Sequence, residues 1–165
     1  FFVDMNKVFK NFFTKLFEVY YFDKIFSQQK QQAWIIEDTK QNIKMIPDII
    51  LQNKRKEITI IDVKYKDKLS VNDLYQIGFY IHEYTSEKKE QEIKEAYAIL
   101  PNFLETQNMQ KSYQATKSKI KIYAKFISID DYIQLITKPN SRKNIVNKIQ
   151  TEILNHDKIK KHYLK

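Results

Sequence analysis

Three consecutive segments give the clearest indication of the fold: IPDIIL at residues 46–51, QNKRKE at residues 52–57 and ITIIDVKY at residues 58–65. The first and third segments are short, apolar and rich in β-branched side chains, which is typical of strands. The middle segment is polar and turn-like, so the three segments together predict a β-hairpin. One aspartate interrupts each apolar run, at Asp48 and at Asp62.

These two aspartates are predicted to lie opposite each other in the hairpin. If the turn centres near Arg55, antiparallel pairing brings the Cβ atoms of Asp48 and Asp62 to about 5 Å from each other. Side chains alternate between the two faces of a strand, so Lys64 points the same way as Asp62. Two carboxylates this close repel each other unless a cation lies between them. A metal ion held by Asp48 and Asp62 is therefore the favoured interpretation.

A cluster of solvated surface charges is the alternative interpretation of Asp48, Asp62 and Lys64. It would suit strands that alternate apolar and polar residues along their whole length. Here both aspartates interrupt nearly continuous apolar runs, which are typical of strands buried on both faces. Burying a carboxylate is costly unless it is paired or binds a metal, so the pattern favours a functional site.

A helix over residues 71–84 is predicted to follow the hairpin. Asp73, Gln76 and Tyr80 share one of its faces; a polar helix face in water is the alternative for these three. Gly78 is the only glycine of the chain, and glycine costs about 1 kcal/mol relative to alanine inside a helix. Close approach to the sheet or to a substrate backbone is the expected reason for it. Apolar residues recur at helical spacing on the other face: Leu74, Ile77, Ile81 and Tyr84.

The chain resembles the PD-(D/E)xK nuclease superfamily at Pro47-Asp48 and at Asp62-Val63-Lys64. Around this signature it is similar to the McrC-type nuclease subunit of 5-methylcytosine restriction (McrBC) systems. The similar segments are DMNKVF at residues 4–9, DVKYK at residues 62–66 and DLYQIGFY at residues 73–80. The resemblance implies an α/β fold with a restriction-endonuclease-like αβββαβ core, in which helices flank a mixed central sheet.

The resemblance also implies a Mg²⁺-dependent endonuclease that hydrolyses phosphodiester bonds in double-stranded DNA, with Mn²⁺ as a substitute ion. Asp48 and Asp62 would hold the metal. Gln76 and Tyr80 would contact the scissile strand or support the catalytic lysine, and Tyr80 is expected to contact DNA together with Lys66 and Asp73. The implied catalytic residues are Asp48, Asp62, Lys64 and Gln76.

A carboxylate on the first helix completes many such sites, and Glu18 is the candidate catalytic residue here. In the McrC-like pattern an acidic residue follows the D-M-N-x-x-F start, but this chain has Lys10 at that position. Glu18 points nearly opposite one apolar stripe of its helix, so helical geometry leaves its role open.

The full order of predicted elements is a helix, three strands, a helix and two strands, with extra helices at the C-terminal end. We expect a helix over residues 4–26, a first strand at residues 34–36, the hairpin and the helix after it, a strand over residues 96–100 stopped by Pro101, and a strand over residues 120–129. Asp130 and Asp131 should cap a helix to Thr137, and a final amphipathic helix should contain Ile145, Ile149, Ile153 and Leu154.

Composition limits the partners and the compartment. A net charge of +9 over 165 residues favours a polyanionic partner, and the two arginines, Arg55 and Arg142, are outnumbered by lysines that suit phosphate contacts better than base recognition. The absence of cysteine fits a reducing cytoplasm, and no membrane span is predicted. We expect residues 1–165 to form a single nuclease domain. Because the chain opens on Phe1, we also expect that domain to be the C-terminal part of a longer protein.

No glycine-rich loop is available to cradle a nucleoside triphosphate, so any motor must be another chain. The resemblance implies a McrB-like AAA+ GTPase or ATPase in that role. Two alternatives stay open: a non-catalytic DNA-binding or assembly subunit with the same fold, and a solitary RecB-like repair nuclease. Lys10 in place of an acid favours the non-catalytic subunit, whereas the intact Asp48, Asp62 and Lys64 argue against it.

Overall fold

The computed structural model describes most of the chain from residue 2 to residue 144. The described residues are 2–20, 24–27, 31–36, 41–52, 58–87, 93, 95–103 and 110–144. The elements are α1 (Met5–Tyr20), β1 (Lys24–Ser27), β2 (Gln31–Ile36), β3 (Gln41–Met45), β4 (Ile49–Gln52), β5 (Ile58–Val63), α2 (Val71–Glu87), β6 (Glu95–Asn102), β7 (Gln110–Gln114), β8 (Lys121–Ser128), α3 (Ile129–Thr137) and a 3₁₀ turn, η1 (Pro139–Ser141).

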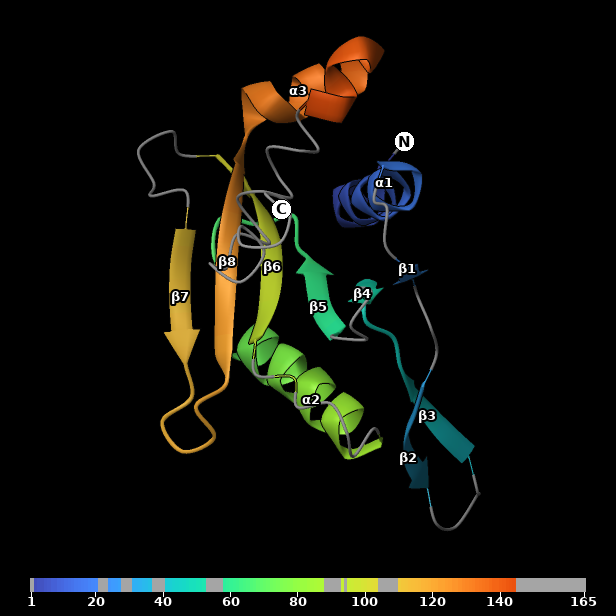
Figure 1. Cartoon of the computed structure of the whole chain (residues 1–165), viewed down its shortest axis with the longest axis vertical. Helices are drawn as coiled ribbons and strands as arrows, with labels where there is room; N and C mark the ends of the chain where they lie inside the picture. Colours follow the sequence, from blue (N-terminus) through green and yellow to red (C-terminus); the bar gives the residue numbers. More distant parts are fainter. Residues whose placement is uncertain are drawn as a thin grey trace, which may run out of the picture.

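A six-stranded mixed sheet forms the centre of the described structure, in the order β1-β4-β5-β6-β8-β7 (Figure 1). Neighbours on the β1 side of β5 are antiparallel, whereas β5, β6 and β8 run parallel to one another. β7 returns antiparallel along the outer edge of β8. The strands β2 and β3 form a separate two-stranded ribbon. The predicted α/β fold with a mixed sheet flanked by helices is confirmed.

The hairpin of β4 and β5 has the predicted register. Ile49 pairs with Ile61 and Gln52 pairs with Ile58, so the same register continued by one residue sets Asp48 opposite Asp62. The predicted turn around Arg55 lies outside the described residues.

The alternation of side chains along these strands separates two apolar layers. Phe9, Phe13 and Phe17 of α1 pack on one face of the sheet, against Ile49, Leu51, Ile61, Val63, Tyr97 and Ile99. Ile77, Ile81 and Tyr84 of α2 pack on the other face, against Ile50, Ile58, Ile60, Ala96, Ala98 and Leu100. Burial on both faces explains why these strands read as continuous apolar runs. An aspartate within such a run is therefore enclosed by protein.

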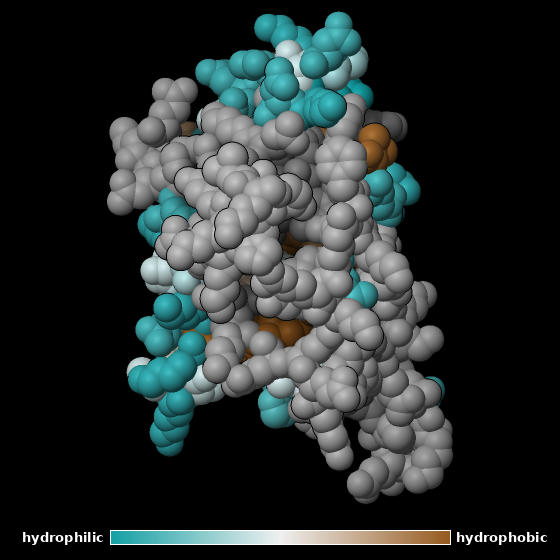
Figure 2. Space-filling model, in the orientation of Figure 1, coloured by the Kyte–Doolittle hydropathy of each residue, from teal (hydrophilic) through white to brown (hydrophobic). Residues whose placement is uncertain are grey.

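Polar residues gather on two parts of the described surface. Hydrophilic side chains gather at the end that carries α3 and along the edge that carries β7 (Figure 2). Four of the five residues of β7, in the sequence QKSYQ, are exposed, and this strand was not predicted. An exposed edge strand lacks the apolar signal by which buried strands are detected.

The first predicted helix and first predicted strand are wrong in their boundaries. Instead of continuing to residue 26, α1 ends at Tyr20, and Lys24–Ser27 form β1. The backbone of β1 pairs with β4 and so satisfies hydrogen-bonding groups that β4 would otherwise leave open at the sheet edge. The strand predicted at residues 34–36 belongs to β2, which pairs with β3 outside the main sheet.

Later predictions fail at two boundaries. β6 continues through Pro101 to Asn102, because beyond Ile99 it pairs with β8 alone and proline's missing N–H is tolerated where one side is unpaired. The cap of α3 is Ser128, whose Oγ accepts a hydrogen bond from the Asp131 backbone N–H at 3.0 Å. The predicted amphipathic helix around Ile149 lies outside the described residues.

Gly78 does not make the close approach to the sheet that was one expected reason for it, and close approach to a substrate backbone stays a prediction. A Cβ atom placed on this residue would meet nothing within 4 Å. Neither the sheet nor another part of the described structure therefore requires glycine at this position.

Candidate active site

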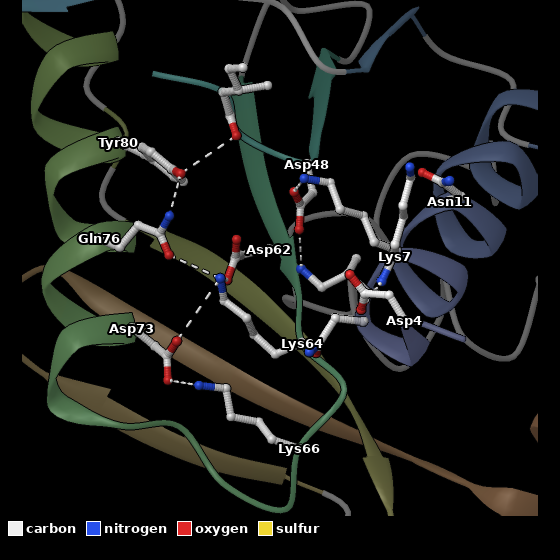
Figure 3. Close-up of a pocket in the computed structure, with 14 residues that line it drawn as sticks. Asp4, Lys7, Asn11, Asp48, Asp62, Lys64, Lys66, Asp73, Gln76 and Tyr80 are labelled. Carbon is white, nitrogen blue, oxygen red and sulfur yellow. Dashed lines mark hydrogen bonds and ion pairs between the residues drawn. The ribbon is translucent and has the colours of Figure 1, made fainter. Parts of the chain in front are cut away.

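A cavity of about 620 Å³ lies between the N-terminal turns of α1 and α2, at the end of β5 (Figure 3). Asp4 starts α1 at its rim, because Asp4 Oδ1 accepts a hydrogen bond from the Lys7 backbone N–H at 3.2 Å. Asn6 then fixes the helix to the sheet by accepting a hydrogen bond from the Tyr65 backbone N–H, also at 3.2 Å. As a result, the polar residues near the start of α1 line the same cavity as the two aspartates.

Asp48 is held by both of its oxygens. Its carboxylate is only 5% exposed, and its Oδ2 accepts a hydrogen bond of 2.8 Å from the Val63 backbone N–H in the neighbouring strand. Its Oδ1 forms an ion pair with Lys10 Nζ from α1. The chain thus fixes this carboxylate from the sheet on one side and from the helix on the other.

Asp62 is the carboxylate of the site whose charged form is most clearly disfavoured by its surroundings. Its side chain is 2% exposed, and its Oδ2 atom is fully buried with no hydrogen-bond partner among the described residues. Lys64 Nζ lies 3.1 Å from that oxygen, within ion-pair distance, but outside hydrogen-bond geometry. Burial, and after it the Asp48 carboxylate, raises the pKa of Asp62 to about 6, against the lowering effect of Lys64. A second cation would relieve both causes.

Lys64 is oriented by α2. Its ammonium donates a hydrogen bond of 2.9 Å to Gln76 Oε1 and lies 4.0 Å from Asp73 Oδ1. Gln76 in turn donates through Nε2 to the Tyr80 hydroxyl at 2.7 Å, and that hydroxyl lies 3.5 Å from the Ile46 carbonyl oxygen to which it donates. This chain of contacts, visible in Figure 3, holds the lysine ammonium beside the Asp62 carboxylate.

Tyr80 is a support of the pocket wall. Its side chain is 6% exposed and packs in the core. Burial and the Asp62 carboxylate raise the pKa of Tyr80 to about 12, although the hydrogen bond with Gln76 opposes this. The phenol is therefore neutral at any ordinary pH and acts as a hydrogen-bonding group.

Asp73 anchors the start of α2. Its Oδ2 accepts hydrogen bonds from the backbone N–H and the hydroxyl of Ser70, and Ser70 Oγ accepts one from the Asp73 N–H in return. This reciprocal pattern is a capping box. Lys66 Nζ pairs with the same carboxylate. Although burial opposes it, the hydrogen bonds from Lys66 and Ser70 lower the pKa of Asp73.

The structure thus brings the predicted site residues into one cavity, with the exception of Glu18. These residues are Asp48, Asp62, Lys64, Gln76 and the expected DNA contacts Lys66, Asp73 and Tyr80. Glu18 pairs with Lys15 on the outside of α1, with Oε2 and Nζ 2.6 Å apart. It follows Lys10 by eight residues, which is roughly 12 Å along a helix axis. The distance along the helix explains why it cannot reach Asp48.

Lys10 is the residue whose role the sequence did not reveal. The sequence marked it as a departure from the McrC-like pattern but gave no partner for it. Its one available signal was its spacing from Asn6, since residues i and i+4 share a helix face and both line the cavity.

The donor set suits a small hard cation that keeps much of its water. Within the described part of the chain, no group of three or more His, Cys, Asp or Glu side chains gathers around a common point. Asp48 and Asp62 offer two carboxylates. Asp62 Oδ2 is buried and has no hydrogen-bond partner among the described residues, although Lys64 Nζ lies 3.1 Å from it. Mg²⁺ is typically bound by one or two carboxylates together with water and substrate phosphate, so these residues fit it.

The chain matches a known protein family over the part that contains this site. A family model described as "McrBC 5-methylcytosine restriction system component" matches residues 1–100, which is more than half of the 165 residues. These include Asp48, Asp62, Lys64 and Gln76. A comparison with curated proteins gave no match.

A solved structure supports the fold. It is described as a refined half-complex from a tetradecameric assembly of Thermococcus gammatolerans McrB AAA+ hexamers with bound McrC. The TM-score is 0.64 at 16% identity, and the match covers 93% of this chain and 34% of the other. This chain therefore spans about a third of the length of the solved one. In the described part of the chain, every helix is too short or too polar to cross a membrane.

Proposed function

The chain belongs to the McrBC 5-methylcytosine restriction system component family, and from this premise we propose that it is a McrC-type nuclease subunit of the PD-(D/E)xK superfamily that hydrolyses phosphodiester bonds in DNA with a divalent metal, Mg²⁺ or Mn²⁺. One observation carries the proposal. Asp48, Asp62 and Lys64 converge in one cavity, and Asp62 Oδ2 is buried there without a hydrogen-bond partner among the residues that the structure describes. A buried carboxylate whose pKa stays raised despite a neighbouring lysine, and which lies beside a second carboxylate, is an arrangement that a bound cation stabilises.

Asp48 and Asp62 would hold the cation. When bound, it supplies stabilisation of the negative charge on the phosphate and a lower pKa for the attacking water. Lys64 would orient that water or neutralise the charge that develops on the phosphate. Its contact with Gln76 matters because such stabilisation depends on a donor fixed in advance of the reaction.

The remaining pocket residues would serve binding and support. Lys7 lies exposed at the rim of the cavity and is available to a phosphate oxygen. Lys66 is 35% exposed but tied to Asp73, so it would contribute positive charge from a fixed place. The net charge of +9 favours DNA as the partner.

A separate AAA+ NTPase would drive the reaction, since this sequence contains a single glycine and no glycine-rich nucleotide loop. The solved assembly, in which McrC is bound to McrB AAA+ hexamers, supports a motor of that class. Such a system would act in the cytoplasm.

Plasmid cleavage in the presence of Mg²⁺ and the motor protein tests the proposal. Asp48→Ala and Asp62→Ala should abolish cleavage, while Asp67→Ala should leave it intact, because Asp67 is exposed on the turn after β5. Cleavage that persists in either site variant would disprove the assignment. Cleavage without any motor would favour a solitary repair nuclease.

The non-catalytic subunit is the second candidate, and the pairing of Lys10 with Asp48 favours it. It predicts that the wild-type protein binds DNA or the motor but does not cut under any metal condition. The same assay therefore separates the two functions.

A further inference from the structure

Lys10 stands where a cation would have to bind. Its ammonium forms an ion pair with Asp48 Oδ1, and the other oxygen of that carboxylate accepts the Val63 N–H. We propose that Lys10 is a built-in counter-ion that competes with the divalent cation for Asp48 and thereby sets the metal affinity of the site. This inference rests on the proposed metal-dependent function and concerns one residue to which that function gives no role.

The two contacts of Asp48, with the Val63 N–H and with Lys10, differ in how easily they can be broken. The Val63 N–H belongs to the backbone of β5 at the centre of the sheet, so it cannot leave without disrupting the strand. Lys10 is held by a flexible side chain that is 32% exposed. Among the described residues, Asp48 is its only ion-pair partner. A cation that binds Asp48 therefore displaces Lys10.

The other lysine of the site behaves differently. Lys64 approaches Asp62 but also donates a hydrogen bond to Gln76 and lies near Asp73. It remains anchored whether or not a cation binds. Asp62 Oδ2 has no hydrogen-bond partner among the described residues, although Lys64 Nζ lies 3.1 Å from it, whereas each oxygen of Asp48 already has a bonded partner, and the partner of Oδ1 is Lys10. The competition is thus located at one carboxylate and at one lysine.

Removing the charge of Lys10 should tighten metal binding roughly tenfold, which corresponds to about 1.4 kcal/mol. Lys10→Gln and Lys10→Met both remove the ammonium, and the second also keeps the apolar stem of the side chain. Lys10→Arg retains a positive charge beside Asp48, so its affinity should stay within about threefold of wild type.

Isothermal titration of the purified, metal-free protein with Mn²⁺, without DNA, measures the effect independently of cleavage. Lys7→Gln is the matched control. Lys7 precedes Lys10 by one helical turn and lines the same cavity, and the variant loses the same charge. Its affinity should change less than about twofold, because an exposed charge acts on the site only through screened long-range attraction. Thermal unfolding verifies that each variant is folded.

The inference is supported if either neutral Lys10 variant binds Mn²⁺ at least fivefold more tightly than wild type and if the gain disappears when Asp48→Asn is added. It is overturned if both neutral variants bind as wild type does or more weakly, or if Lys7→Gln gains as much. When wild type binds Mn²⁺ and the Lys10 variants bind equally, only this inference fails. When no variant binds Mn²⁺, the proposed metal-dependent function fails as well.

Discussion

Replacing Asp62 with asparagine should stabilise the metal-free protein at neutral pH. Burial and the nearby Asp48 raise the pKa of this carboxyl from its ordinary value of 3.8 to about 6. The difference of about two pH units, at 1.36 kcal/mol each, means that ionised Asp62 costs the folded state about 3 kcal/mol. Asparagine keeps the shape of the side chain and removes this cost.

The pH dependence identifies the cause. Between about pH 4 and pH 6 the unfolded chain has lost the proton of this carboxyl while the folded chain still binds it. The folded state therefore binds more protons, and the contribution of Asp62 to stability falls as the pH rises through that window and levels off above it. Relative to wild type, Asp62→Asn should gain about 3 kcal/mol from pH 4 to pH 7.

Urea denaturation at pH 4, 5, 6 and 7, in the presence of a chelator, measures this gain. Asp67→Asn controls for the loss of an exposed carboxylate on the neighbouring turn and should show no comparable gain. A difference between Asp62→Asn and wild type that stays constant over this range would refute the reasoning, since a pH-independent effect cannot come from the ionisation of Asp62.

Four further predictions address the scaffold, the lysine and the glutamine that contacts it. Gly78→Ala should stabilise the protein by about 0.5–1 kcal/mol in urea denaturation, because a Cβ there meets nothing within 4 Å; a loss of stability would contradict the open space. Phe13→Ala should cost about 3–5 kcal/mol in the same assay, because this ring is 0% exposed between α1 and the sheet; a cost below 1 kcal/mol would argue against this packing. Lys64→Ala should abolish single-turnover cleavage yet retain Mg²⁺ binding by calorimetry, and loss of metal binding would show that the lysine has a different role. Gln76→Leu should slow cleavage by roughly 10- to 100-fold through a misplaced lysine, and an unchanged rate would exclude that positioning role.

The sequence predicted the centre of the fold well because local patterns determine it. The two apolar runs and their spacing predicted the register of β4 and β5, and that register sets Asp48 opposite Asp62. Helical spacing likewise placed Gln76 and Tyr80 on one face of α2, where they now contact each other. Each of these results depends on residues near one another in the chain.

What the sequence could not predict depends on how distant elements pack. The ion pair between Lys10 and Asp48 exists because α1 packs on one face of the sheet, and no local pattern reports that placement. The end of α1 was misjudged for a similar reason, since residues 24–27 become a strand by pairing with β4. Tyr80 is buried because α2 packs on the sheet, which no local pattern reported, and its expected contact with DNA stays a prediction.

Diffraction from crystals grown with excess Mn²⁺ tests the central claim most directly, because Mn²⁺ gives an anomalous signal that locates the ion. We expect one peak within roughly 2.1 Å of a carboxylate oxygen of both Asp48 and Asp62, a distance typical of small divalent cations, with the Lys10 ammonium moved away from Asp48. A cavity without such a peak, in which Lys10 still pairs with Asp48, would contradict it.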